Sequence, residues 1–468
     1  MRTLSAVEQR GIEPVPENER NGNPLQLFWV WFAANISILG LPLGATLVAV
    51  QGLNLWQALL VAAIGAGGSF AIVGVISTAG RRGGAPSMTL SRSVFGPRGN
   101  AGPTLVSLLS RLGWETVNTT TGAFVLLSLF ALVFGSSADA RTVPLLALAA
   151  IALFELCTLL VSGLGHAAIL VIQKWATWIF GALNIAVAVA LIATVDWSAV
   201  AAAPGGSFSA VLVGIGTIAA GTGIGWANAG ADMARYQKTS AKAGHLVASS
   251  AAGAGIPLVL LIGLGAVLSA GDTTLATAND PVAAIRDLLP SWMAVPYLIA
   301  AFGGLLLSNH LSVYSAGLTT LTLGVRIPRV WAVSVDVVVT FLGSIYFMLI
   351  AGSFYGPFIS FISLLAIPIT AWLAVFLADL LKRRWYDPEA LLNMGRGGRY
   401  WYAGGVEWRA VGSWLAAVVC GYVLLGLGQS GIAWIVAFAV AAAGYLALGG
   451  ARGTLDAPVP AVSERARG

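Results

Sequence analysis

Long apolar runs alternate with short polar segments along most of the chain. An α-helix needs about 20 consecutive apolar residues to cross a membrane. The pattern therefore predicts an all-α polytopic membrane protein with twelve transmembrane helices. We place these helices at residues 25–50, 53–79, 101–134, 143–163, 167–195, 207–235, 243–270, 293–323, 330–351, 357–380, 409–427 and 430–450.

Two of these segments carry residues that interrupt a helix. The sixth contains GTGIGWANAG (221–230), and each glycine in a helix interior costs about 1 kcal/mol relative to alanine. The first contains Asn35, Gly40, Pro42 and Gly44, and proline removes an amide donor. Backbone groups freed at a break cannot face lipid and must line a cavity or a ligand. We therefore expect a binding site at the two breaks, near the middle of the membrane.

The two interrupted segments lie five helices apart. This odd offset gives two five-helix units opposite orientations, as in secondary transporters built from inverted repeats. We expect broken helices 1 and 6 within a 5+5 inverted repeat, followed by two accessory helices. The expected parts are a mobile cytoplasmic tail (1–24), the first repeat (25–195), the second repeat (207–380), a cytoplasmic loop (381–408), accessory helices 11–12 (409–450) and a cytoplasmic tail (451–468).

Composition supports this class and excludes others. Charged residues make up 9% of the chain, against about 25% in soluble domains. Of the 25 Lys and Arg, only Arg141 and Arg286 fall in predicted outside loops, and Arg111 and Lys174 fall within spans. This bias follows the positive-inside rule. It predicts a multi-pass plasma-membrane protein with both termini cytoplasmic, and it accounts for the net charge of +6 without a nucleic-acid partner.

Tryptophan and asparagine residues accompany the predicted breaks. Trp226 and Asn228 lie within the sixth segment, and Trp114 and Asn118 share one face of the third because they are four residues apart. Indole rings stack on planar bases, and amides match the donor and acceptor groups of a base edge. These residues favour a site for a flat, polar, neutral ring. The alternatives are interfacial packing for tryptophan and interhelical hydrogen bonding for asparagine.

Two further amides lie in interrupted or polar spans. Asn309, in the eighth segment, is a candidate for the same site or for a cation site. Asn35, in the first segment, either contacts the ligand or satisfies backbone groups at the break. Cys157 and Cys420 lie in apolar segments and the three histidines on separate segments. We therefore expect no metal site and no enzyme.

Ionisable residues within the spans are candidates for proton coupling, namely Lys174, His310 and Glu115. Each also has a structural interpretation. Glu115 follows Arg111 by four residues, which favours an ion pair on one helix face. Lys174 would snorkel towards the interface or pair with Glu155, and His310 would be a satisfied core histidine.

The stretch GGAPSMTLSRSVFGPRGN (83–100) resembles the signature of the nucleobase–cation symporter-1 family, the cytosine, purine, allantoin and hydantoin permeases. The runs ANISILGLPLG (34–44) and NHLSVYSAGL (309–318) are similar to that family too. The resemblance covers about residues 20–450. It implies the leucine-transporter-like fold, with five plus five inverted helices and two extra.

The resemblance also implies roles for individual residues. The family holds its base between an aromatic residue on segment 3 and another on segment 6, which match Trp114 and Trp226. The family's polar positions match Asn118, Asn228 and Asn309.

The family's sodium-using members take backbone carbonyls from segment 1, which align near Ala33 and Ile36. They also take a carbonyl and two adjacent hydroxyls from segment 8. The hydroxyl positions become Leu307 and Ser308 here, so one oxygen ligand is missing unless Asn309 or a water replaces it. The coupling ion, Na⁺ or H⁺, therefore stays open.

Together these features predict a secondary active transporter that imports a nucleobase, cytosine or a purine, by cation symport and alternating access. Segments 1, 2, 6 and 7 would rock against segments 3, 4, 8 and 9. The expected partners are the base, the coupling cation and the lipid bilayer, with no cofactor and a monomeric chain. The alternative is a symporter for allantoin, hydantoin or a vitamin-precursor heterocycle.

Overall fold

The computed structural model describes residues 8–271, 273–276, 280–352 and 355–450, which form helices joined by loops and two isolated β-bridges. Within this described part, eleven helices are long and apolar enough to cross a membrane, or twelve if one bent pair counts as a single span. The predicted all-α class and the number of crossings are confirmed.

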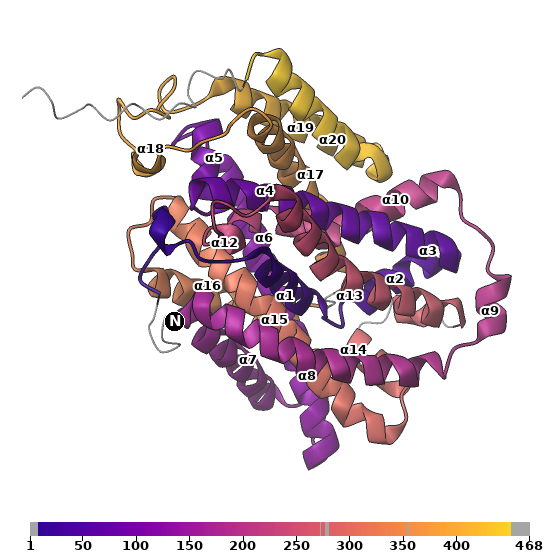
Figure 1. The fold of residues 1–468 in the computed structure, drawn as a ribbon. Coiled ribbons are helices and arrows are strands. Elements are labelled where there is room, and N and C mark those ends of the chain that lie inside the picture. The colour runs from indigo at the N-terminus through magenta and orange to yellow at the C-terminus, as the bar shows by residue number, and fades with distance from the viewer. Residues whose placement is uncertain (1–7, 272, 277–279, 353–354, 451–468) are drawn as a thin grey trace, which may run out of the picture.

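The spans follow the predicted order (Figure 1). They are α1 (Pro24–Asn35) with α2 (Gly40–Ala49), α3 (Leu55–Ala62) with α4 (Ser69–Gly83), α6 (Ala101–Phe134), α7 (Pro144–Leu164), α8 (His166–Ile192), α10 (Phe208–Ala219) with α11 (Gly225–Ala227) and α12 (Gly230–Ala234), α13 (Ala243–Gly271), α15 (Ser291–Thr322), α16 (Arg329–Ile345), α17 (Tyr355–Leu380), α19 (Trp408–Gly426) and α20 (Ser430–Ala447). Shorter helices lie between them, namely α5 (Ser87–Phe95), α9 (Trp197–Ala202), α14 (Pro281–Asp287) and α18 (Pro388–Leu392).

Both predicted interruptions are present. The helices α1 and α2 meet at an angle of 64° across a short break. In the sixth span, Thr222 has non-helical backbone angles (φ −128°, ψ −107°), and the helix then continues only as the short pieces α11 and α12. The glycines and the proline of these stretches therefore mark real breaks.

Glycine allows the first broken span to approach α13 closely. A Cβ atom at Gly44 would clash with the carbonyl of Ile262, and one at Gly265 would clash with the carbonyl of Leu41. Small residues at helix interfaces allow such backbone approach in membranes. The broken span α1–α2 is therefore held along its length by α13, which also contacts α4. At one edge of the molecule, α19 and α20 pack together beside α17 (Figure 1).

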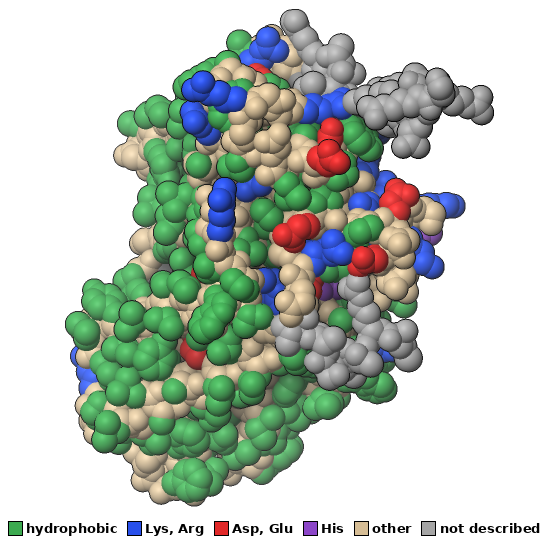
Figure 2. Space-filling view, turned by 90° about the vertical axis from the view of Figure 1, so that its left-hand side faces the viewer, with side chains coloured by type: hydrophobic (Ala, Val, Ile, Leu, Met, Phe, Trp, Pro, Cys, Tyr) green, Lys and Arg blue, Asp and Glu red, His purple; other side chains and the backbone are tan. Residues whose placement is uncertain are grey.

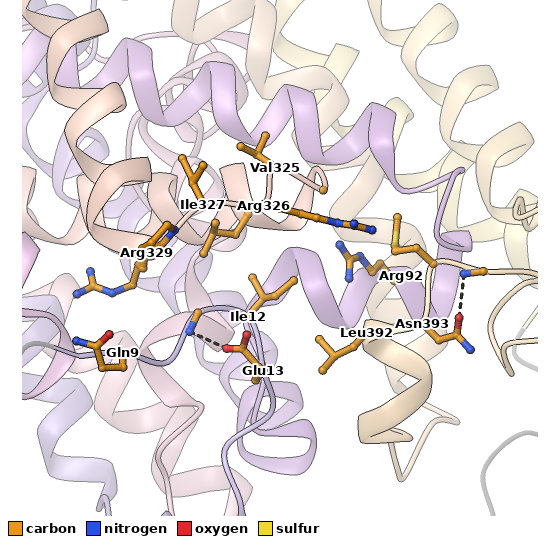
Figure 3. Close-up of a pocket in the computed structure, with 16 residues that line it drawn as sticks. Gln9, Ile12, Glu13, Arg92, Val325, Arg326, Ile327, Arg329, Leu392 and Asn393 are labelled. Carbon is orange, nitrogen blue, oxygen red and sulfur yellow. Dashed lines mark hydrogen bonds between the residues drawn. The ribbon is translucent and has the colours of Figure 1, made fainter.

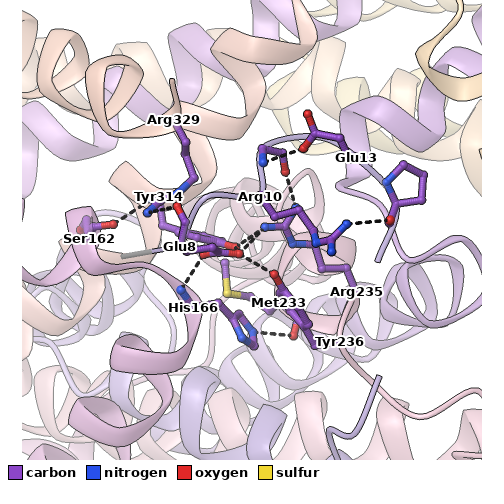
Figure 4. Close-up of polar contacts among 12 residues, drawn as sticks. Glu8, Arg10, Glu13, Ser162, His166, Met233, Arg235, Tyr236, Tyr314 and Arg329 are labelled. Atoms are coloured by element: carbon purple, nitrogen blue, oxygen red, sulfur yellow. Dashed lines mark hydrogen bonds and ion pairs between the residues drawn. The ribbon is translucent and has the colours of Figure 1, made fainter. Parts of the chain in front are cut away.

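The predicted mobility of the N-terminal tail is wrong for its described part, which begins at Glu8. The carboxylate of Glu8 forms an ion pair with the guanidinium of Arg235 (2.7 Å) and accepts a hydrogen bond from the hydroxyl of Tyr236 (2.6 Å) (Figure 4). Arg235 is fully buried, and a buried charge needs a counter-charge. The tail supplies that counter-charge and is therefore packed.

The signature stretch is packed into the molecule. All nine residues of α5 are buried. Arg92 is 2% exposed and donates to the carbonyls of Leu391 (2.9 Å) and Thr322 (2.5 Å). This arginine thus ties α5 to two distant segments. On the face drawn in Figure 2, charged side chains gather in the upper part, whereas apolar side chains cover most of the lower part.

Candidate functional site

A cavity of about 50 Å³ lies where the two broken spans meet α6 and α15. The breaks supply Asn35, Ser37, Thr222 and Trp226 to its wall. The long helices supply the remaining polar and aromatic groups, namely Trp114, Asn118 and Ser308. Four of the six predicted substrate residues therefore line one cavity: Trp114, Asn118, Trp226 and Asn35.

Trp226 is held by neighbours that differ from the predicted ones. The guanidinium carbon of Arg111 lies 4.4 Å from the centre of the Trp226 ring, and Arg111 Nη2 donates to the carbonyl of Gly225. The ring of Trp31 meets Trp226 edge-on, with centroids 5.5 Å apart. Arg111 thus binds both the backbone of the sixth span and its aromatic ring, which fixes the orientation of the indole.

The predicted ion pair between Arg111 and Glu115 is wrong. Among the described residues, Arg111 has no carboxylate within ion-pair distance, and the oxygens of Glu115 have no hydrogen-bond partner. Carbonyls at a helix break lack the usual helical donors, and the carbonyl of Gly225 takes the guanidinium instead. Glu115 is fully buried on α6.

The remaining amides lie behind the cavity wall. Asn118 Nδ2 donates to Asn309 Oδ1 (3.4 Å), and Asn309 Nδ2 donates to Thr158 Oγ1 (3.1 Å). Asn309 is therefore one hydrogen bond away from the cavity. Asn228 Nδ2 donates to Ser107 Oγ (2.8 Å), and its Oδ1 is buried without a hydrogen-bond partner in the described part of the chain.

Asn35 serves the broken backbone as well as the cavity. Its Nδ2 donates to the carbonyl of Trp31 (2.8 Å), one turn earlier in α1. Sequence reasoning missed the partners Ser107 and Thr158, and it had no signal for them because isolated hydroxyls are common in membrane helices. It also had none for the role of Arg111, whose partner lies on another span.

The candidates for proton coupling are dispersed. Lys174 is exposed, with its ammonium 5.7 Å from the ring centre of Trp175. The alternative pairing of Lys174 with Glu155 is wrong, since the Glu155 carboxylate accepts hydrogen bonds from Thr119 (2.9 Å) and Thr340 (2.6 Å). His310 is 1% exposed on α15.

The residues at the predicted sodium positions of the first and eighth spans pack against one another, and their binding of sodium stays a prediction. The side chain of Leu307 belongs to a buried apolar cluster with Ala33 and Ile36. The carbonyl of Leu307 accepts a hydrogen bond from Gln173 Nε2 (2.8 Å). Hard cations need a shell of oxygen ligands, and the carbonyl of Ile36 faces α15, where a Cβ atom at Gly304 would lie 2.7 Å from it. Ser308 lines the cavity at the breaks.

A larger cavity, about 990 Å³, lies apart from the breaks (Figure 3). The N-terminal segment, α5 and the loop after α15 form its walls, with the side chains of Arg92, Arg326 and Arg329 on them. Among the described residues that line it, none is aromatic. A neutral base is better served by the smaller cavity, where indoles and amides converge.

Comparison with known proteins agrees with this geometry. Residues 14–448 match the family described as permease for cytosine/purines, uracil, thiamine, allantoin. The chain belongs to this family. A putative purine-cytosine permease of Bacillus subtilis (strain 168), YxlA, is 28% identical over 94% of this chain and 96% of its own. The purine-cytosine permease FCY2 of Saccharomyces cerevisiae is 29% identical over 59% of this chain and 49% of its own.

The fold of this permease is similar to that of transporters with solved structures. Mhp1, a nucleobase-cation-symport-1 family transporter in a closed conformation with bromovinylhydantoin bound, superposes with a TM-score of 0.74 at 18% identity, covering 95% of each chain. MhsT, in complex with L-phenylalanine, gives a TM-score of 0.61 at 16% identity, covering 90% of this chain and 99% of its own. The predicted family and its leucine-transporter-like fold are confirmed, and the chain is a membrane permease.

Proposed function

We propose that this permease imports a nucleobase, cytosine or a purine, across the plasma membrane by proton symport and alternating access. The base would lie in the cavity at the two helix breaks, between the rings of Trp114 and Trp226. Asn118 would contact its hydrogen-bonding edge, with Asn309 and Asn228 supporting the site. Both termini would be cytoplasmic, and the chain would act as a monomer.

One observation carries this proposal: two tryptophans and two amides from three spans line a single cavity at the points where two spans break. Base–aromatic stacking contributes about 1–3 kcal/mol per base, and it does not depend on charge. The cavity wall has no charged side chain among its described residues. A neutral planar ring therefore matches the wall better than an amino acid or an anion does.

Cation coupling is proposed as proton coupling because Leu307 replaces one of the two hydroxyl ligands expected for sodium on the eighth span. The test is uptake of radiolabelled cytosine and adenine into proteoliposomes, with proton and sodium gradients imposed separately. We expect accumulation with an acid-outside gradient and none above background with sodium alone. Uptake driven only by a sodium gradient would refute proton coupling. The absence of binding and uptake for every nucleobase would refute the substrate class.

A further inference from the structure

Glu155 is a buried carboxylate close to the hydrogen bonds that support the base cavity. It lies on α7 and is 3% exposed. Its Oε1 accepts hydrogen bonds from Thr119 on α6 (2.9 Å) and Thr340 on α16 (2.6 Å). Its Oε2 is buried and has no hydrogen-bond partner among the described residues. Two hydroxyls therefore fix the carboxyl group, and Oε2 is the atom left to bind a proton.

The cations on the helices around α7 are engaged elsewhere. Arg111 binds the sixth span, Lys174 is exposed, and Arg329 donates to the carbonyls of Ser162 and Gly163. A buried carboxylate without a paired cation neutralises by binding a proton. The ionisable groups on the helices that contact α7 (α6, α8, α15 and α16) are Arg111, Glu115, His166, Lys174, Tyr297, His310, Tyr314, Arg329 and Asp336.

A short chain of hydrogen bonds runs from the cavity to the helix that carries this carboxyl group. Asn118 lines the cavity and donates to Asn309, which donates to Thr158 on α7. Thr158 is three residues after Glu155, so both side chains lie on one face of that helix. Thr119, which donates to Glu155, directly follows Asn118 on α6. The cavity and the carboxyl group are therefore supported by neighbouring residues on α6 and on α7.

We propose that Glu155 binds the coupling proton, and that the chain Asn118–Asn309–Thr158 links its protonation to the base. This inference rests on the proposed import of a base. A proton adds to Oε2 of the carboxylate and gives the neutral acid, and its release restores the carboxylate with no other bond changed. A base that contacts Asn118 competes with the hydrogen bond to Asn309. Binding of the base and of the proton are then linked, and the linkage acts equally in both directions.

The test compares Glu155→Gln with the wild type in proteoliposomes, using radiolabelled cytosine and adenine. Glutamine keeps the size and the hydrogen-bond acceptor but cannot exchange a proton. Two modes are measured, namely base exchange without a gradient and accumulation driven by an acid-outside gradient. Asp336→Asn is the matched control, because Asp336 is a buried carboxylate on α16 that accepts a hydrogen bond only from Thr320 among the described side chains.

We expect Glu155→Gln to keep exchange close to the wild-type rate and to lower driven accumulation by about tenfold or more, within the range of coupling energies between sites. Asp336→Asn should keep both modes. Undiminished accumulation in Glu155→Gln, or its loss only in Asp336→Asn, would overturn the assignment. If the wild type neither binds nor exchanges any base, the proposed function has failed rather than this inference.

A second variant covers the case in which Glu155→Gln does not fold. Thr119→Val with Thr340→Val removes both hydroxyl donors and leaves the carboxyl group in place. Hydrogen bonds to a carboxylate favour its charged form, so their loss should move half-maximal uptake to a higher pH. An unchanged pH profile in the folded double variant would also contradict the proposal.

Discussion

At the scale of single residues, the site depends on side chains whose neighbours come from other spans. Trp226 lies under the guanidinium of Arg111 and against the edge of Trp31. An indole held on two sides loses few conformations when a planar ligand stacks on it. This preorganisation distinguishes Trp226 from the tryptophans exposed on the outer surface, such as Trp175 (63% exposed).

Replacing Trp226 with alanine tests its stacking role. We expect Trp226→Ala to weaken binding of cytosine or adenine about 5- to 150-fold, since stacking contributes about 1–3 kcal/mol. Equilibrium binding to the purified protein measures the change. Trp175→Ala is the matched control and should bind like the wild type. Equal affinity of Trp226→Ala and the wild type would remove this residue from the site.

A second prediction concerns the tail and pH. Burial raises the pKa of Glu8, but Arg235, His166 and Arg329 outweigh it and lower the pKa from 4.5 to about 2. Because the pKa of Glu8 is lower in the folded state, its ionised carboxylate stabilises the fold at pH values above 4.5. This contribution is lost as the pH falls from about 4.5 towards 2.

Glu8→Gln should therefore destabilise the fold at pH 7 by about 3 kcal/mol, because Arg235 keeps a buried, unpaired charge. Thermal unfolding in detergent between pH 7 and pH 3 measures the difference. The difference should shrink at the acidic end of the range. A gap between variant and wild type that is constant with pH would contradict this account.

At the scale of elements, the breaks depend on glycine. A Cβ atom at Gly223 would clash with Ser69 and lie 2.6 Å from the backbone nitrogen of Phe70, whereas one at Gly221 would meet only the side chain of Leu43 at 3.6 Å. The broken sixth span thus packs on α4 through one glycine and tolerates a side chain at the other.

Alanine at these two positions should separate packing from mere helix propensity. We expect Gly223→Ala to weaken base binding and lower the melting temperature, because the backbone of the break must move away from α4. Gly221→Ala should keep the wild-type melting temperature, whereas its effect on binding reports its place in the cavity wall. Equal effects of the two substitutions, in binding and in thermal unfolding, would argue against the close contact.

The sequence predicts the elements well and their side-chain partners poorly. Runs of apolar residues determine the spans, and glycine with proline marks the breaks at 36–39 and 220–229, because both signals are local. The wrong expectations concern partners, such as Glu115 for Arg111 and Glu155 for Lys174. Spacing along one helix suggested the first pair, whereas the fold offers Arg111 a carbonyl on another span. The packing of the tail could not be foreseen from its polarity alone.

In the site too, the sequence predicts which residues take part better than it predicts what they contact. Trp114, Asn118, Trp226 and Asn35 line one cavity, and spacing together with the family resemblance pointed to them. The expected role of Asn228 and Asn309 as direct contacts stays a prediction, since both are hydrogen-bonded beside the cavity. Their positions depend on how α15 packs against α6 and α7, which no local pattern encodes.

At the scale of the whole molecule, the fold brings two broken spans against a set of long helices. The broken span α1–α2 packs along α13, and α15 packs along α6. This division fits the expected rocking of segments 1, 2, 6 and 7 against segments 3, 4, 8 and 9. The cavity at the breaks lies between the two groups, as the proposed alternating access requires.

The central claim is that a planar base is held between Trp114 and Trp226 at the two breaks. An electron-density map of the purified protein with saturating cytosine or adenine tests it most directly. We predict flat density between the two indoles, with an edge in hydrogen-bond reach of Asn118. Density for the base elsewhere, for instance in the arginine-lined cavity of Figure 3, would contradict the account.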